Sequence, residues 1–184
     1  MALKRLTING YGQIELNQVA FRRDGRIEAQ CHLDKDAFSK EVPAENGMLL
    51  VVDNVNRLVK MPAGDANELI ALNYTTEHMY DERANALKDF YLVPGSFLPR
   101  LGYLAKGDKF TTNCLAYDDG EFANDDAVKK AVANFKTVPV YGVPCELGAI
   151  KLTAEAGEGV CLIVVENGTM PDGQFGVKLQ TIKE

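Results

Sequence analysis

Alternating and continuous runs of hydrophobic residues predict that most of this chain forms short β-strands. Hydrophobic and polar residues alternate strictly over 26–33, the pattern of a half-buried strand, and this alternation places His32 on the solvated face. Two continuous apolar runs, 48–52 and 160–165, predict central strands buried on both faces. Further strands are expected over 13–21, 57–61, 149–154 and 175–180.

The longest apolar and aromatic stretch covers residues 88–113 and is divided by proline and glycine. Pro94 and Pro99 each lack a backbone donor and disfavour helix in the preceding residue. We therefore expect short extended pieces whose side chains lie in a sheet interior. A tight turn is expected over 105–108, after which Phe110 returns to the apolar pattern among threonines.

Asparagine or aspartate followed by glycine occurs six times, and both residue types tolerate the positive φ of two-residue hairpin turns. The clearest example is Asp24-Gly25, which predicts a hairpin between strands 13–21 and 26–33. The change of parity between Leu16 and Val19 predicts a β-bulge in the first of these strands. Residues 53–56 are expected to close a second hairpin. The other glycine dipeptides are Asn9-Gly10, Asn46-Gly47, Asp119-Gly120, Asn167-Gly168 and Asp172-Gly173.

Two segments have the 3.6-residue period of amphipathic helices. The first covers about 76–90 with Thr76 as its cap, and its apolar stripe is Tyr80, Ala84, Leu87 and Tyr91. The second covers about 125–136 with Asn124 as its cap, and its stripe is Val128, Ala131, Val132 and Phe135. Polar residues 34–44 and the break at 62–67 are expected to be loops.

These elements predict a mainly β, α+β fold: an antiparallel, hairpin-rich sandwich or barrel with two short inserted helices. A chain of 184 residues is long enough for one domain with a self-supporting core. We expect a single domain over 1–184, with sub-layers 1–62 and 91–184 around a helical insertion at 63–90.

Composition and charge exclude several classes of protein. The net charge of −6 argues against direct binding of nucleic acid or of an anionic membrane, because both require a basic face. No signal peptide is expected, and no apolar run approaches the roughly 18 residues of a membrane-spanning helix. The four cysteines lie singly in apolar patterns, which predicts buried free thiols in a reducing cytosol: Cys31, Cys114, Cys145 and Cys161.

Candidate chemistry is sparse. Phosphate-binding loops and serine-nucleophile motifs are absent, and two histidines do not match the spacing of a zinc site. Cys114 with His78 as its base would be a nucleophile pair, but a strand-like setting favours a core cysteine. The acidic groups at 118–121 and 125–126 would suit calcium, although turn and capping chemistry explains them. We predict a protein that is not an enzyme, with no catalytic, cofactor-binding or metal-binding residues.

The remaining pattern resembles the small virion proteins of tailed phages, of the head decoration or cement type. The segments that carry it are RRDGRIEAQCHLD, ENGMLLVVDNVNRLVKMP, LPRLGYLAKGDKFTTN and VVENGTMPDGQFGVKLQTIKE. The resemblance implies a non-enzymatic protein made in the host cytoplasm and located in the virion. It also implies binding to the major capsid protein or another virion protein, and a homo-oligomer, with a trimer favoured.

Two alternatives remain from the sequence. One is an enzyme or small-molecule-binding β-barrel with a pocket built from the aromatic residues Tyr91, Phe97, Tyr103 and Phe110. The other is a cytoplasmic bacterial assembly or adaptor protein. A deep, partly polar pocket would favour the first, whereas a flat apolar patch favours an interaction protein.

Overall fold

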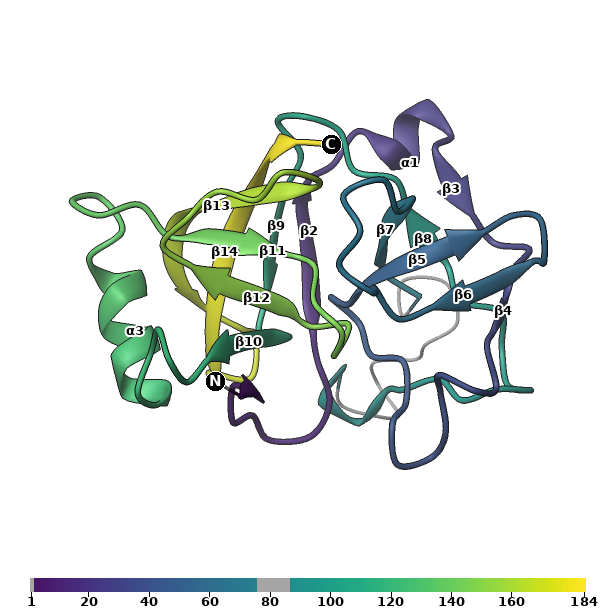
Figure 1. The fold of residues 1–184 in the computed structure, drawn as a ribbon, viewed down its shortest axis with the longest axis horizontal. Coiled ribbons are helices and arrows are strands. Elements are labelled where there is room, and N and C mark those ends of the chain that lie inside the picture. Colours follow the sequence, from purple (N-terminus) through teal and green to yellow (C-terminus); the bar gives the residue numbers. More distant parts are fainter. Residues whose placement is uncertain (1, 76–86) are drawn as a thin grey trace.

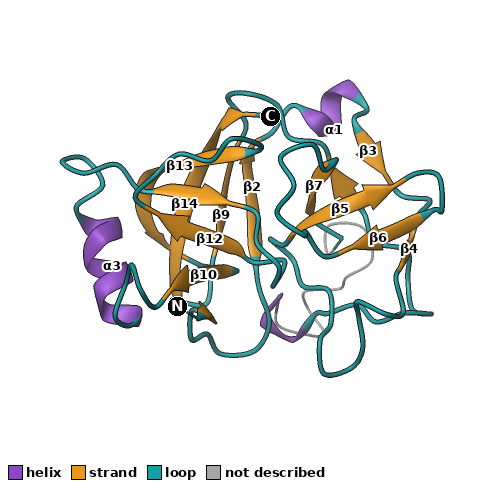
Figure 2. Ribbon diagram, viewed as in Figure 1, coloured by secondary structure: helices purple, strands orange, loops and turns teal. Residues whose placement is uncertain are grey.

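The protein is built from two β-sheets that lie side by side (Figures 1 and 2). The computed structural model describes residues 2–75 and 87–184. Strands make up 35% and helices 9% of the structure, which confirms the expected mainly β, α+β fold.

The larger sheet has eight strands in the order β1-β10-β12-β11-β13-β14-β9-β2. Its neighbouring strands are antiparallel except for the parallel pair β10 and β12. Two hairpins, β11–β12 and β13–β14, supply its centre. The strands are β1 (Leu3–Arg5), β2 (Ile14–Gln18), β9 (Lys109–Thr112), β10 (Leu115–Asp118), β11 (Tyr141–Val143), β12 (Ile150–Thr153), β13 (Cys161–Thr169) and β14 (Phe175–Lys183).

The smaller sheet has six strands in the order β3-β8-β7-β5-β6-β4, of which β4 and β6 are parallel. The strands are β3 (Ile27–Glu28), β4 (His32–Leu33), β5 (Leu49–Asp53), β6 (Leu58–Lys60), β7 (Ile70–Asn73) and β8 (Leu101–Gly102). Both expected central strands are confirmed, because β5 and β13 each pair with a strand on either side. The sheets do not follow the division into 1–62 and 91–184, since β1 and β2 belong to the larger sheet and β8 to the smaller.

The helix expected over 125–136 is present as α3 (Asp125–Ala133), one turn shorter than expected. The side chain of Asn124 accepts a hydrogen bond from the Ala127 amide at 3.0 Å, which confirms the predicted cap. Val128 and Val132 are its buried residues. Of the helix expected over 76–90, residues 76–86 lie outside the described residues, and its end is the short 3₁₀ helix η1 (Leu87–Asp89).

The prediction of a hairpin at Asp24-Gly25 is wrong. The segment forms a helical turn, α1 (Phe21–Asp24), and Gly25 ends it in the left-handed conformation with φ +72°. The flanking strands β2 and β3 lie in different sheets. The turn carries Phe21 into the core against Gly102, where a Cβ atom would lie 2.5 Å from the Phe21 ring.

Of two further predictions for the neighbouring strands, one is confirmed and one is wrong. The bulge expected in 13–21 is confirmed, because the pairing of β2 with β9 shifts register between Glu15 and Gln18. The continuous strand expected over 26–33 is instead two short strands, β3 and β4. His32 is exposed, as its place in the alternation predicted.

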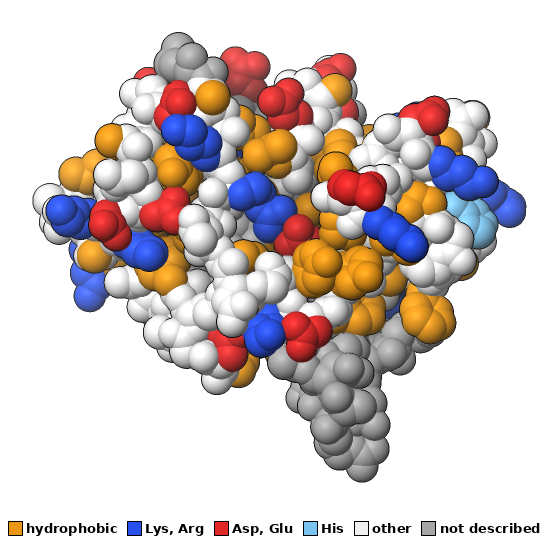
Figure 3. Space-filling view, turned by 90° about the horizontal axis from the view of Figure 1, so that it is seen from below, with side chains coloured by type: hydrophobic (Ala, Val, Ile, Leu, Met, Phe, Trp, Pro, Cys, Tyr) orange, Lys and Arg blue, Asp and Glu red, His pale blue; other side chains and the backbone are white. Residues whose placement is uncertain are grey.

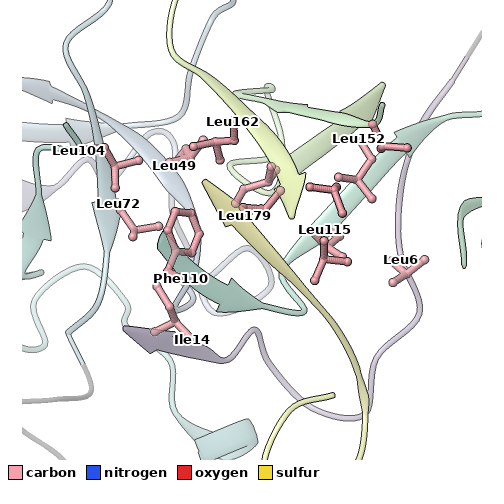
Figure 4. Close-up of a cluster of buried hydrophobic side chains, with 14 of the residues drawn as sticks. Leu6, Ile14, Leu49, Leu72, Leu104, Phe110, Leu115, Leu152, Leu162 and Leu179 are labelled. Atoms are coloured by element: carbon pink, nitrogen blue, oxygen red, sulfur yellow. The ribbon is translucent and has the colours of Figure 1, made fainter. Parts of the chain in front are cut away.

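A hydrophobic cluster fills the space between the two sheets (Figure 4). Leu49 and Leu72 of the smaller sheet belong to the same cluster as Phe110, Leu162 and Leu179 of the larger sheet. All five are fully buried. A second cluster also joins the sheets, since it includes residues of β5 and of β10. The two sheets therefore share their cores.

The long apolar stretch 88–113 is only partly in sheet interiors. Leu101 and Phe110 are buried there, and the expected turn at 105–108 is confirmed by a hydrogen bond of 2.9 Å from the Asp108 amide to the Ala105 carbonyl. Phe97 and Leu98 are instead exposed. Among the described residues their segment pairs with no strand, because it follows the turn over 93–96 and precedes Pro99.

Candidate functional site

Four large hydrophobic side chains are exposed on two neighbouring loops, and we call them the loop patch. Residues 39–44 carry Val42, which is 50% exposed, and residues 91–98 carry the other three: Tyr91 (42%), Phe97 (55%) and Leu98 (39%). Backbone hydrogen bonds of 2.9 Å in both directions between Ala44 and Leu92 hold the loops together. Figure 3 shows hydrophobic side chains gathered on the lower face of the molecule.

The 91–98 loop is fixed to the N-terminal segment. The rings of Tyr91 and Tyr11 lie with their centroids 4.5 Å apart, and the Tyr11 amide donates to the Lys88 carbonyl at 2.7 Å. Gly10 is required beside this bond, because it has φ +82° and a Cβ atom there would lie 2.4 Å from the Lys88 oxygen. Ser96 closes the turn by donating its hydroxyl to the Val93 carbonyl.

Beside Val42 lies a hollow of about 270 Å³, which we call the methionine hollow. Two methionine sulfurs meet in its wall over Gly148, where a Cβ atom would lie 2.9 Å from Sδ of Met61 and 3.1 Å from Sδ of Met48. Gly148 has φ +70°, so its backbone also favours glycine. The main lining residues are Val42, Pro43, Met48, Met61, Leu147 and Arg5.

An ion pair between Arg5 and Glu45 forms the polar part of this hollow. Nη1 and Nη2 of Arg5 donate to the two carboxylate oxygens at 3.0 and 2.9 Å, and Glu45 also accepts from the Gly12 amide at 2.6 Å. Glu45 is buried. Burial opposes the charge of Arg5, but the neighbouring Cys114 and the hydrogen bond with Glu45 raise its pKa above the ordinary value. Arg5 is therefore charged at every accessible pH.

Cys114 is not poised as a nucleophile. It is fully buried, and burial raises the pKa of its thiol to about 12, so the thiolate is absent at neutral pH. Its proposed base, His78, lies outside the described residues. All four cysteines are buried and free, as the sequence predicted.

The four aromatic residues proposed for a ligand pocket lie in different environments. Phe110 belongs to the shared core, and Tyr103 packs against the second cluster. Tyr91 and Phe97 are half exposed in the loop patch. None of the four lines the methionine hollow, so the structure does not bring them together as one pocket.

The acidic groups serve turns only in part, because Asp118 closes a turn whereas Asp119 and Asp125 bond to the N-terminal segment. Asp118 accepts from the Gly120 amide at 2.8 Å, and Asp125 accepts from the Thr7 amide at 3.0 Å. Asp119 accepts from the Ala2 amide at 2.7 Å, and this hydrogen bond and Lys4 lower the pKa of its carboxyl. Within residues 2–75 and 87–184, no three His, Cys, Asp or Glu side chains are grouped to hold a metal. The helices described there are too short or too polar to cross a membrane.

A wider, more open hollow of about 680 Å³ lies on the larger sheet. Its polar side chains bond one another: Lys178 pairs with Glu166 at 2.6 Å, and Thr111 donates its hydroxyl to Asn17 at 2.7 Å. These contacts match ordinary cross-strand pairs on a solvated sheet face. The loop patch and the methionine hollow are therefore the stronger candidate site.

Sequence reasoning singled out Tyr91 and Phe97 but missed Arg5, Glu45 and the methionines. Arg5 and Glu45 are 40 positions apart, and no local pattern signals their pairing. The one local feature that could have indicated this site is Glu45, a glutamate close to the buried run 48–52. Such a glutamate is too common in sequences to be diagnostic. Comparisons of the chain with protein-family models, curated proteins and solved structures found no match.

Proposed function

We propose that this protein is a non-enzymatic structural component of a tailed-phage virion, a decoration or cement protein that binds the capsid through its loop patch. The observation that supports this function is the group of four exposed hydrophobic side chains on two joined loops. Grouped exposed hydrophobic residues on a protein surface mark interaction sites. The resemblance of four sequence segments to phage decoration proteins supplies the class of partner, the major capsid protein or another virion protein.

The loops that carry the patch are held in place before any partner binds. The paired hydrogen bonds of Ala44 and Leu92, and the contact of Tyr91 with Tyr11, fix both loops to the body of the protein. Binding through fixed loops avoids the entropic cost of ordering them. A homo-oligomer, which we propose to be a trimer, would present several copies of the patch to a repeating surface and gain avidity.

Removing hydrophobic surface from the patch is expected to weaken capsid binding without unfolding the protein. The variant Phe97→Ser, Leu98→Ser changes two exposed side chains. We expect its affinity for phage particles assembled without this protein to fall about tenfold or more, as for truncated anchor residues at interfaces. The measurement is co-sedimentation of purified protein with those particles over a range of concentrations.

The matched control is Val138→Ser, because Val138 is as exposed as Phe97 and follows α3. It should bind like the unmodified protein. If the unmodified protein does not sediment with the particles, the proposed function is wrong. If the double variant binds as tightly as the control, the patch is not the binding surface. A bacterial assembly or adaptor protein would use the same patch on a cellular partner and would leave the particles unbound.

A further inference from the structure

We infer that the methionine hollow receives one uncharged aliphatic side chain of the partner. We also infer that a lysine or arginine beside that side chain pairs with the acidic rim of the hollow, which is formed by Glu41 and Glu146. This inference deepens the proposed function, on which it rests, by naming the chemistry of the partner segment. The hollow adjoins the loop patch, since Val42 belongs to both. The same docking event would therefore cover both.

The walls of the hollow suit an aliphatic side chain. Val42, Pro43 and Leu147 contribute apolar surface, and the sulfurs of Met48 and Met61 meet over Gly148. Methionine thioethers are flexible and polarisable, and they adapt to apolar side chains of different shape. At about 270 Å³ the hollow is smaller than most small-molecule pockets, and it has more than enough room for one aliphatic side chain.

The polar part of the hollow does not call for a charged occupant. Both terminal nitrogens of Arg5 bond to Glu45, and the second carboxylate oxygen also accepts from the Gly12 amide. Among the described residues, Nε of Arg5 is buried without a hydrogen-bond partner, and this single N–H group does not demand a charged acceptor. The two formal charges therefore compensate each other within the protein. A charged group that entered this site would lose its hydration, and no unpaired opposite charge would compensate for that loss. The occupant is therefore uncharged.

The rim selects for positive charge beside the aliphatic residue. Glu41 and Glu146 line the hollow and are both exposed. Ser39 donates its hydroxyl to Glu41 at 2.8 Å, and this hydrogen bond lowers the pKa of the carboxyl and holds the charge in place. Two carboxylates on a protein with net charge −6 complement a basic segment. An aliphatic residue flanked by lysine or arginine fits both the walls and the rim.

The test is nuclear magnetic resonance of protein labelled with ¹³C at the methionine methyl groups. The probe is an acetylated, amidated lysine-leucine-lysine tripeptide, and lysine-serine-lysine is the matched control. We expect saturable shifts of the Met48 and Met61 signals with the leucine peptide and none with the serine peptide. Met170, which packs against Gly176 of β14 and does not line the hollow, should not respond. Unchanged Met48 and Met61 signals at millimolar leucine peptide would overturn the inference.

Two variants test the acidic rim. Glu146→Gln should weaken binding of the leucine peptide about twofold to fivefold, in line with an exposed ion pair, and added salt should reduce the difference. Val55→Ser, in the turn between β5 and β6, should leave binding unchanged. Equal binding by both variants would overturn the role of the rim. If the Met48 and Met61 signals shift on raising protein concentration without peptide, a second copy of the chain occupies the hollow and the inference is wrong.

This experiment needs no phage particles. Peptide binding without particle binding would therefore contradict the proposed function and leave the hollow as a site for basic-aliphatic segments. Particle binding without peptide binding would be consistent with the decoration role and would contradict the inference about the occupant of the hollow.

Discussion

Replacing Leu50 by aspartate is expected to prevent folding. Leu50 is the second residue of β5 and is fully buried. This strand pairs on both sides within the smaller sheet, and Leu50 belongs to the cluster that also includes Ala116 of β10. An unpaired carboxylate there costs several kcal/mol, which is on the order of the total stability of a domain. We expect insoluble protein, or soluble protein without a cooperative thermal transition by circular dichroism.

Asp24→Ala is the control for this change. Asp24 ends the surface turn α1 and pairs with Arg23 at 2.9 Å, and both side chains are well exposed. Its loss is expected to cost less than about 1 kcal/mol. The corresponding change in the larger sheet is Leu162→Asp, because Leu162 is fully buried in β13. Val160 began the apolar run expected to form this strand, but it lies before β13 and is only partly buried. A soluble, cooperatively melting Leu50→Asp protein would contradict the placement of β5.

Replacing Arg5 by methionine is expected to have the second largest effect. Methionine fills similar space but leaves the buried Glu45 carboxylate without its bidentate partner. Removing one partner of a buried ion pair costs about 3–5 kcal/mol. For a chain of this length, 1 kcal/mol corresponds to a shift of about 2–4 °C, so the melting temperature should fall by about 10 °C. Differential scanning calorimetry measures this shift.

The neighbouring Lys4 supplies a control in the same strand. Lys4 pairs with Asp119 at 3.3 Å, but its side chain is half exposed, so Lys4→Met should cost no more than about 1 kcal/mol. Glu45→Gln in the Arg5→Met background should recover part of the lost stability, because an amide is less costly to bury than an unpaired charge. Equal melting temperatures for Arg5→Met and Lys4→Met would show that the buried ion pair does not stabilise the fold.

Hydrophobic periodicity was sufficient to locate the elements whose environment is decided locally. The continuous apolar runs became β5 and β13, each paired on both sides, and the 3.6-residue stripe with an asparagine cap became α3. The alternation at 175–180 became β14, with Val177 and Leu179 buried. Burial of one face or of both faces dictates these patterns, so they can be read without knowing the partner strands.

The glycine dipeptides were less informative, because positive φ serves several kinds of turn. Of the six, only Asp172-Gly173 closes a hairpin between neighbouring strands, β13 and β14. Asp24-Gly25 ends a helical turn, Asn167-Gly168 lies within β13, and Asn9-Gly10 connects β1 and β2, the opposite edges of the larger sheet. Four of the six glycines have positive φ (Gly10, Gly25, Gly47 and Gly173), but the dipeptide does not specify which strands meet across it.

Strand order and the candidate site depend on contacts between distant residues. The parallel pairing of β10 with β12 and the ion pair of Arg5 with Glu45 have no local signal in the sequence. The aromatic residues of the 88–113 stretch were expected to be buried together. Phe97 became exposed instead, because the turn at 93–96 and Pro99 keep its segment out of both sheets.

Mass spectrometry of phage particles purified or induced from the organism whose genome encodes this chain tests the proposed function most directly. We predict that the chain is recovered from the particles at a copy number near that of the major capsid protein, since a decoration protein covers a repeating lattice. Complete absence of the chain from the particles, with the protein remaining in the soluble lysate, would contradict the proposed function.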